Sequence, residues 1–152
     1  MRPAPKIRAL ALALAVSGCA HRPPGVSCAA ANLPTVARAM PDILALAESP
    51  PASLEAGFVL CGRERERLLA ASADLGAKGY SSYIGTGDGG GQCLRVARTH
   101  EASVAALEQE MTAMCRIADT HRIAYRHWQA EVGGKSVRLA GAKLTVDGKT
   151  VR

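Results

Sequence analysis

The sequence has few aromatic residues, no apolar run long enough to cross a membrane, and no closely spaced metal ligands. One Trp, three Tyr and one Phe make up 3% of its 152 residues. A membrane-spanning helix needs about 20 apolar residues, whereas the apolar run at residues 9–16 is much shorter. Zinc sites need paired ligands such as Cys-x-x-Cys or His-x-His, and the chain has neither spacing. We therefore expect no spanning helix, no metal site and no cofactor.

The first 18 residues are similar to a bacterial export signal. Three cations within the first eight residues precede the apolar run, which is the order of charged and apolar regions in a signal peptide. The Val-Ser-Gly segment before Cys19 resembles the lipobox of bacterial lipoprotein precursors. We expect residues 1–18 to be removed and Cys19 to carry lipid, which would anchor the protein in the cell envelope, facing the periplasm. An ordinary signal peptide with a coincidental cysteine is the alternative.

The charge of the chain gives little support to nucleic-acid binding. Lys and Arg number nineteen against thirteen Asp and Glu, but three of the nineteen lie in residues 1–18 and would be lost with the signal. Nucleic-acid binding leaves a concentrated basic patch, and RNA-binding sheets stack bases on aromatic side chains. Residues 93–98, an expected strand, contain no aromatic residue. Direct nucleic-acid binding is therefore not expected.

Composition divides the mature chain into three parts. Residues 19–53 are rich in Ala and Pro and are predicted to form a partly ordered tether, whose short helical patterns are interrupted by Pro41. All five aromatic residues lie in residues 54–132, which we expect to hold the core. Residues 133–152 form a basic tail. The Asp147-Gly148 pair in this tail predicts a β-hairpin, with a frayed tail as the alternative.

Residues 54–132 alternate between the apolar periods of strands and helices. Strands are expected at residues 56–61, 80–86, 93–98 and 123–132, and helices at residues 63–77 and 99–120. The order βαββαβ packs most simply as a ferredoxin-like α+β fold, with a four-stranded antiparallel sheet and two helices on one face. The glycine-rich residues 87–91 then form a hairpin loop. They lack the Lys-Ser/Thr ending of a phosphate-binding loop.

Four cysteines remain if Cys19 is lipidated. In the expected sheet the first and third strands are antiparallel neighbours, which places Cys61 near Cys93 and suggests a disulfide in an oxidising compartment. Pairing of Cys28 with Cys115 is a secondary hypothesis. Free buried thiols are the alternative to both bridges.

Three segments of the central domain resemble the RraB family, whose members inhibit ribonuclease E. These are LGAKGY at residues 75–80, QCLRVAR at residues 92–98 and YRHWQAEV at residues 125–132. The last is similar to the family's Tyr-Asp-Gly-Trp segment, although Arg126-His127 replaces Asp-Gly and only Tyr125 and Trp128 match. The resemblance implies a ferredoxin-like domain that binds a protein partner and is not an enzyme.

Two departures separate this chain from the family. The founding type of the family has acidic extensions, whereas this chain has a basic tail, and ribonuclease E works in the cytoplasm, which a mature lipoprotein does not reach. The leading expectation is a membrane-anchored, protein-binding, non-catalytic lipoprotein. A true cytoplasmic ribonuclease regulator with a misread N-terminus is the first alternative. An envelope enzyme is the second, although the sequence shows no converging set of catalytic residues.

The candidate partner-binding residues lie in two expected strands. Trp128 is a candidate recognition residue because large amphipathic rings anchor many interfaces, but strand alternation also favours a place in the core. Tyr125 and His127 would then point to the open sheet face, beside Cys93 and Arg95. We therefore treat Tyr125, His127, Trp128 and Arg95 as the binding candidates.

Overall fold

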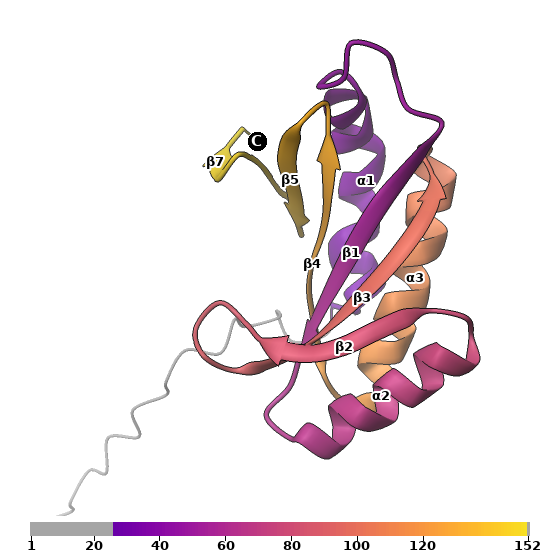
Figure 1. The fold of residues 1–152 in the computed structure, drawn as a ribbon, viewed down its shortest axis with the longest axis vertical. Helices are drawn as coiled ribbons and strands as arrows, with labels where there is room; N and C mark the ends of the chain where they lie inside the picture. The colour runs from indigo at the N-terminus through magenta and orange to yellow at the C-terminus, as the bar shows by residue number, and fades with distance from the viewer. Residues whose placement is uncertain (1–25, 152) are drawn as a thin grey trace, which may run out of the picture.

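The first strand of the chain, β1 (Ser53–Cys61), lies inside the sheet, and its successive side chains point to opposite faces. The computed structural model describes residues 26–151 and contains three helices and a seven-stranded antiparallel sheet in the order β2-β3-β1-β4-β5-β6-β7 (Figure 1). The elements are α1 (Cys28–Leu44), β1 (Ser53–Cys61), α2 (Arg65–Ala77), β2 (Ser81–Thr86), β3 (Gln92–Glu101), α3 (Val104–His121), β4 (Ala124–Val132), β5 (Lys135–Ala140), β6 (Lys143–Val146) and β7 (Lys149–Thr150). The expected ferredoxin-like fold, with four strands and two helices, is wrong.

The additional elements lie in the two segments that the sequence predicted to be outside the core: α1 in residues 19–53, and β5, β6 and β7 in residues 133–152. An edge strand at β4 would expose the polar backbone groups along its free side. Strand β5 covers that side, pairing Trp128 with Leu139 and Val132 with Lys135. Strand β5 was not predicted from the sequence, because the basic residues of this segment indicated a tail. The alternation of Val137 and Leu139, which are both buried, was therefore not recognised as a strand.

Helix α1 occupies much of the segment predicted to be a tether. Ser27 caps it by accepting a hydrogen bond from the Ala30 amide at 3.1 Å. Pro34 and Pro41 both lie inside the helix. Proline in a helix interior costs about 3 kcal/mol, so the prediction of an interruption at Pro41 was reasonable from the sequence alone. Burial of the apolar side of α1 against α3 offsets this cost.

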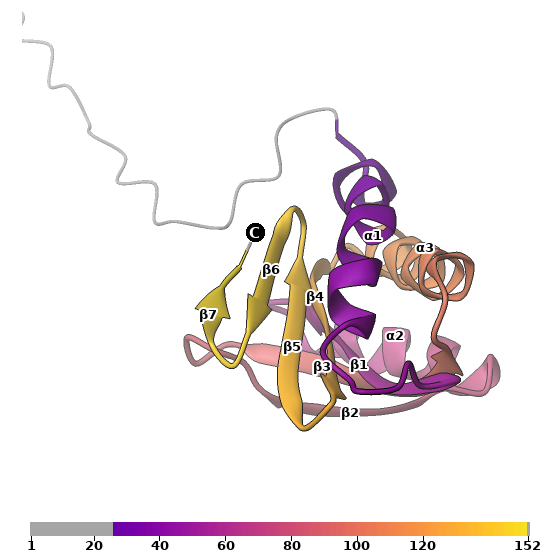
Figure 2. The ribbon, with the colours of Figure 1, turned by 90° about the horizontal axis from the view of Figure 1, so that it is seen from above.

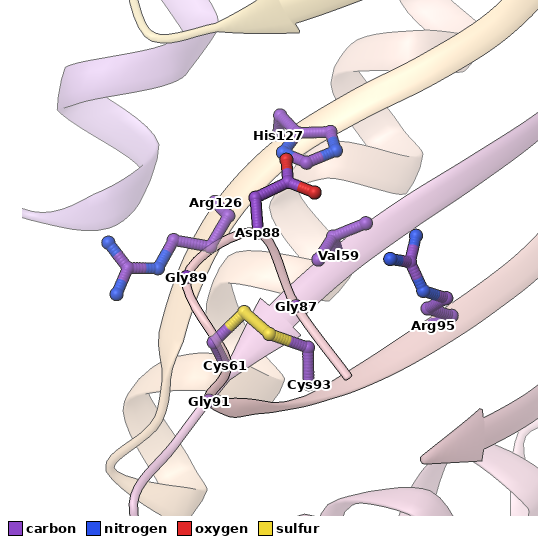
Figure 3. A pocket seen from close by; sticks show the side chains of 10 residues that line it. All are labelled: Val59, Cys61, Gly87, Asp88, Gly89, Gly91, Cys93, Arg95, Arg126 and His127. Carbon is purple, nitrogen blue, oxygen red and sulfur yellow. A yellow bond between two sulfur atoms is a disulfide. The ribbon is translucent and has the colours of Figure 1, made fainter. Parts of the chain in front are cut away.

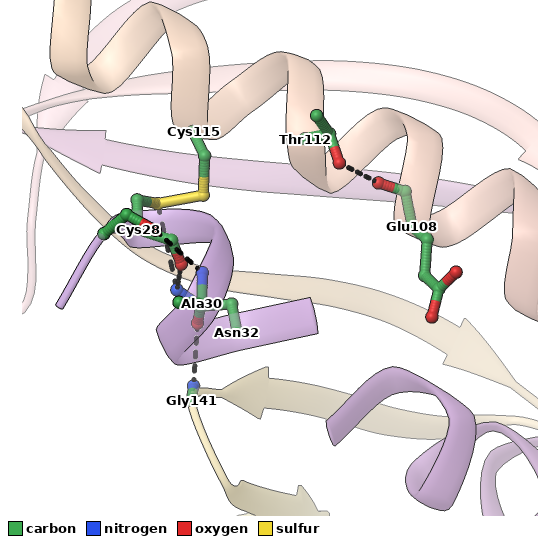
Figure 4. The surroundings of a disulfide bond; sticks show 8 residues. Cys28, Ala30, Asn32, Glu108, Thr112, Cys115 and Gly141 are labelled. Atoms are coloured by element: carbon green, nitrogen blue, oxygen red, sulfur yellow. Dashed lines mark hydrogen bonds between the residues drawn. A yellow bond between two sulfur atoms is a disulfide. The ribbon is translucent and has the colours of Figure 1, made fainter. Parts of the chain in front are cut away.

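Helix α1 is also fixed at its N-terminal end. A disulfide joins Cys28 to Cys115 of α3 (Figure 4). One turn later, the Asn32 side chain accepts from the Gly141 amide at 3.1 Å, and the Thr35 hydroxyl donates to the Gly141 carbonyl at 2.7 Å. Residues 28–44 are therefore part of the folded domain, docked on α3 and on the β5–β6 turn.

The C-terminal segment forms the hairpin predicted at Asp147-Gly148, between β6 and β7, and a further hairpin between β5 and β6 that the sequence did not predict. Asp147 and Gly148 both have positive φ, 47° and 77°, between β6 and β7. Asp-Gly favours this backbone conformation in two-residue hairpins because glycine and aspartate tolerate it. Val137, Leu139 and Leu144 of β5 and β6 are buried and extend the core.

All three helices lie on one face of the sheet, and the other face is left uncovered (Figures 1 and 2). Alternate residues of β1 point toward the helices: Leu54, Ala56, Phe58 and Leu60 are all buried members of the core. The remaining residues of the strand face the open side. The sheet thus separates an apolar layer covered by helices from a face that carries no helix.

The predicted signal peptide and the lipidation site at Cys19 lie outside the described residues. Within residues 26–151, none of the helices is long and apolar enough to cross a membrane.

Candidate functional site

The open face carries a row of polar side chains that crosses four strands. Arg95 on β3 and His127 on β4 both lie directly opposite Val59 of β1. Arg138 on β5 lies opposite Gln129, two residues from His127 along β4. Side chains two residues apart on a strand share a face. The sheet therefore brings Arg95, His127 and Arg138 to one surface, although they come from three separate strands.

Two hollows lie on this surface and share His127 in their walls. The first, of about 450 Å³, lies between the glycine loop and strands β1, β3 and β4 (Figure 3). The second, of about 500 Å³, lies over strands β5 to β7. We name the two together the arginine cleft. The first hollow is lined by Val59, Cys61, Gly87, Asp88, Gly89, Gly91, Cys93, Arg95, Arg126 and His127, and the second by His127, Ser136, Arg138, Ala140, Lys143, Thr145, Gly148 and Thr150.

A disulfide and the glycine loop form one wall of the first hollow. Cys61 and Cys93 are direct cross-strand partners, with Cα atoms 4.0 Å apart, and their sulfurs are bonded, which is the pairing hypothesised from the sequence. The loop turns over this bridge, and the Gly87 amide donates to the Gly91 carbonyl at 2.7 Å. A Cβ at position 87 would collide with the Cys93 sulfur. Glycine is thus required at position 87 for steric reasons, in addition to its role in the hairpin loop that the sequence predicted.

His127 is buried in the floor of the cleft. Its residue is 8% exposed, and its Nε2 lies 3.2 Å from the side-chain oxygen of Gln129. Burial lowers the pKa of His127 below its usual 6.5, and the nearby positive charge of Arg138 lowers this pKa further. The hydrogen bond to Gln129 acts in the opposite direction. The imidazole is therefore neutral at pH 7 and adds a hydrogen-bonding group without a charge.

Positive charge predominates around His127. The residues lining the two hollows include Arg95, Arg126, Arg138 and Lys143, against one carboxylate, that of Asp88. A guanidinium nitrogen of Arg138 lies 3.1 Å from an Asp88 oxygen, and the two side chains are 45% and 75% exposed. Exposed ion pairs of this kind contribute only about 0–1 kcal/mol. The cleft is therefore suited to an anionic ligand.

Tyr125 does not share this surface, contrary to the expectation from strand alternation. Val59 pairs with His127, but the next residue, Leu60, pairs with Tyr125, so Arg126 is an additional residue in β4. A β-bulge of one residue reverses which face the following side chains occupy. Tyr125 consequently packs against the helix-covered core, and its buried hydroxyl has no partner among the described residues. Burial also raises the pKa of Tyr125.

Trp128 belongs to the core, which was the alternative favoured by strand alternation. It is fully buried, and its indole N–H donates to Nε2 of His100 at 3.3 Å. The other ring nitrogen of His100 lies 2.7 Å from the Glu101 carbonyl. An Nδ1–H tautomer of His100 satisfies both bonds. Trp128 therefore supports the sheet from the helix side and does not contact the cleft.

A second charged cluster lies at the edge of the helix-covered layer. The Tyr80 hydroxyl donates to Glu110 of α3 at 2.6 Å, and Arg98 of β3 donates to the other Glu110 oxygen at 3.1 Å. The Arg98 guanidinium also lies over the Tyr80 ring, 4.7 Å from its centre. Burial and the Glu110 carboxylate raise the pKa of Tyr80 to about 12. These contacts join α3 to the sheet, and each carboxylate oxygen of Glu110 accepts a hydrogen bond.

Sequence reasoning missed Arg126, Arg138 and Asp88. Alternation in residues 135–140 would have indicated that Arg138 faces away from Val137 and Leu139, but the segment was assigned to a basic tail. The bulge at Arg126 and the approach of Asp88 to β5 had no local signal. Within residues 26–151, no group of three or more His, Cys, Asp and Glu side chains is arranged to hold a metal ion.

Comparison of the chain with protein-family models, curated proteins and solved structures found no match. The interpretation of the arginine cleft therefore rests on the residues of this chain.

Proposed function

We propose that the protein is a membrane-anchored lipoprotein of the cell envelope whose folded domain binds a protein partner through the arginine cleft and acts without catalysis. The resemblance to the RraB family supports a binding role, because its members act by binding a protein. That resemblance stays a prediction carried by three short segments. The cleft supports a binding role independently, because it is an uncovered, charged surface on a rigid sheet.

The distribution of the five cysteines carries the first half of this proposal. Four of them form two disulfides, Cys28–Cys115 and Cys61–Cys93, as expected for an oxidising compartment. The fifth is Cys19, at the predicted lipobox. This arrangement favours an exported chain with one cysteine reserved for lipid, over a cytoplasmic regulator whose thiols would be kept reduced.

The position of the chain entry supports the second half. The described chain begins just before α1, which lies in the helical layer on one side of the sheet (Figure 2). The residues that line the arginine cleft belong to the opposite face of the strands. The Cys28–Cys115 bridge joins this entry point directly to α3. Attachment to a tether through the helical layer leaves the open face accessible to a partner.

Anchoring is tested by replacing Cys19 and fractionating the cells. We expect the wild-type protein in the membrane fraction with a lipid-bearing Cys19 as its first residue, and Cys19→Ser in the soluble fraction. A Cys28→Ser/Cys115→Ser double variant controls for loss of cysteine and is expected to remain lipidated. Recovery of wild-type protein in the cytoplasm with Met1 intact would contradict the proposal and favour a cytoplasmic regulator.

Partner binding is tested with a photo-crosslinking amino acid at one exposed position on each side of the sheet. Tyr83 lies opposite Arg95 on the open face and is 65% exposed, whereas Leu69 on α2 is 50% exposed. In intact cells, we expect a specific crosslinked protein from position 83 and none from position 69. Equal crosslinking from both positions would show that the open face is not the binding surface.

A further inference from the structure

We propose that the arginine cleft binds an acidic peptide segment, and that the carboxylate of Asp88 occupies part of this site until the peptide displaces it. The inference rests on the proposed protein-binding function and specifies the chemistry of the partner. It is argued from the positions of the guanidinium groups, from the contact of Asp88 and from the shape of the cleft.

The arginines are placed to bind carboxylates from several directions. In Figure 3, the guanidinium groups of Arg126 and Arg95 lie on opposite sides of the group formed by Val59, Asp88 and His127. Within residues 26–151, the Arg95 guanidinium donates one hydrogen bond, at 3.3 Å to the Thr86 carbonyl, and its other donors are available. A planar guanidinium can bind a carboxylate through two parallel hydrogen bonds.

Asp88 shows where a ligand carboxylate would bind. It is carried by a loop in which it is the only residue other than glycine, and it reaches across to Arg138 on β5 at 3.1 Å. The two positions are separated by 50 residues in the sequence, so the contact depends on the fold. Because both side chains are largely exposed, the ion pair is weak enough for an incoming carboxylate to replace Asp88.

The shape of the cleft favours an extended peptide over a single small anion or a nucleic acid. Its two hollows adjoin at His127 and continue from β3 to β7, which gives an elongated surface with cations in both parts. The second hollow adds the side chains of Ser136, Thr145 and Thr150, whose hydroxyls can bind backbone groups of a peptide. Neither hollow is lined by Phe, Tyr or Trp, and the ring of His127 in their walls is buried, so the cleft presents little exposed ring surface on which bases could stack.

The decisive experiment measures peptide binding to the full-length, lipidated protein in detergent by fluorescence anisotropy. The probe is a labelled short peptide of alternating glutamate and serine, and its counterpart has glutamine in place of glutamate. We expect binding of the glutamate peptide that weakens with added salt, and at least tenfold weaker binding of the glutamine peptide. Equal binding of the two peptides would overturn the proposal.

Three variants separate the cleft from general electrostatic attraction. Arg95→Gln and Arg138→Gln should each weaken binding about five- to tenfold, because each removes a charge-assisted contact. Arg116→Gln removes the same charge from the exposed side of α3 in the helical layer and should leave affinity unchanged. A similar loss in all three variants would mean that net charge alone attracts the peptide, which would overturn the proposed site.

Asp88→Asn provides the sharpest test, because the two explanations of Asp88 predict opposite results. If Asp88 competes with the ligand, the variant should bind the glutamate peptide several-fold more tightly. If Asp88 instead organises Arg138 for binding, the variant should bind more weakly, and the displacement proposal would be wrong. Inorganic phosphate is the competitor in a parallel titration. Complete displacement of the peptide by phosphate at low concentration would identify a phosphate site and contradict a peptide ligand.

A second readout locates the bound peptide at His127. The charged groups facing this ring are Arg95 from β3, Arg138 from β5, Asp88 from the loop and Arg126 from its own strand. Carboxylates bound to the arginines should raise the pKa of His127, measured by NMR of the imidazole. An unchanged His127 pKa on saturation would place the peptide elsewhere. If crosslinking at position 83 succeeds while the glutamate peptide fails to bind, the binding function stands and the acidic ligand is rejected.

Discussion

The two faces of the sheet are built by different rules. The helix-covered face is filled by apolar side chains from every element except β7. Its buried His100 and Glu110 side chains have partners, whereas the Tyr125 hydroxyl has none among the described residues. On the open face, the hydrogen bond from Arg95 to Thr86 is long, at 3.3 Å, and the Arg138–Asp88 ion pair is exposed. We therefore expect the helix-covered face to contribute most of the free energy of folding, and the open face to provide the groups that bind a partner.

The same difference applies to the two disulfides. Cys28–Cys115 joins α1 to α3 within the helical layer, whereas Cys61–Cys93 joins two paired strands on the open face. The Cys28–Cys115 bridge closes a much longer segment of chain, and it fixes α1, a helix that has no backbone hydrogen bonds of a sheet to hold it in place. The second reinforces strands that are already hydrogen-bonded, and it shapes the wall of the cleft. The following predictions test this division of roles, from the largest expected effect to the smallest.

Substitution of two residues of β4 that face opposite sides of the sheet should give the largest difference in stability. Trp128→Ala removes a fully buried ring and the donor to His100, and we expect it to lower the free energy of unfolding by about 3–5 kcal/mol. Glu131→Ala, three residues along the same strand and exposed, should change it by less than about 0.5 kcal/mol. Chemical denaturation measures both. Similar values for the two variants would contradict the assignment of the faces.

Removal of the disulfides should show which layer depends more on covalent support. We expect Cys28→Ala/Cys115→Ala to lose about 4 kcal/mol of unfolding free energy, because the bridge spans 87 residues. Cys61→Ala/Cys93→Ala, which removes a bridge spanning 32 residues, should lose about 1 kcal/mol less. Thermal unfolding of the two variants compares them directly. A greater loss from the shorter bridge would show that the open face depends more on its disulfide than the helical layer does.

Substitution within the glycine loop should affect the open face alone. Gly87→Ala places a Cβ against the Cys93 sulfur, and we expect a loss of about 1–3 kcal/mol with the loop displaced from the disulfide. Gly91→Ala is the matched control, since a Cβ at position 91 has open space and its φ is not positive. Unfolding free energies and amide chemical shifts of the loop measure the effect. Equal effects at the two positions would refute the steric requirement.

The smallest effect should be a dependence of stability on pH through His127. Because the folded-state pKa of His127 lies below 6.5, the unfolded chain binds a proton more readily than the folded protein does. Stability should therefore fall as pH decreases below about 6.5, and should level off once pH is below the folded-state pKa. His127→Gln should remove this component of the pH profile. A wild-type stability that increases on acidification through this range would contradict the burial of a neutral ring.

Local sequence patterns identified most individual elements between residues 54 and 132. A compact apolar run at residues 56–61 predicted β1, alternation in residues 93–98 predicted β3, and the helical period of Leu107, Met111 and Met114 predicted α3. The same patterns failed at α1, where two prolines concealed a helix, and at β5. In both places the stabilising contacts come from parts of the chain that are distant in sequence.

The candidate site was only partly predictable for the same reason. Alternation placed Arg95 and His127 on one face, and the expected order of strands suggested the Cys61–Cys93 bridge. The change of face at Tyr125 depends on a bulge, which appears only when β4 is paired with β1. Arg138 reached the cleft only because β5 extended the sheet.

The sequence by itself determined the apolar alternation of individual strands and the presence of four cysteines besides Cys19, and it is the whole basis of the predicted export signal, since these depend on residue types at short spacing. Tertiary structure alone decided the width of the sheet, the docking of α1 and the meeting of Asp88 with Arg138. Strand pairing joins residues that are far apart in the chain. The β-propensity of a segment does not specify which distant strand will pair with it.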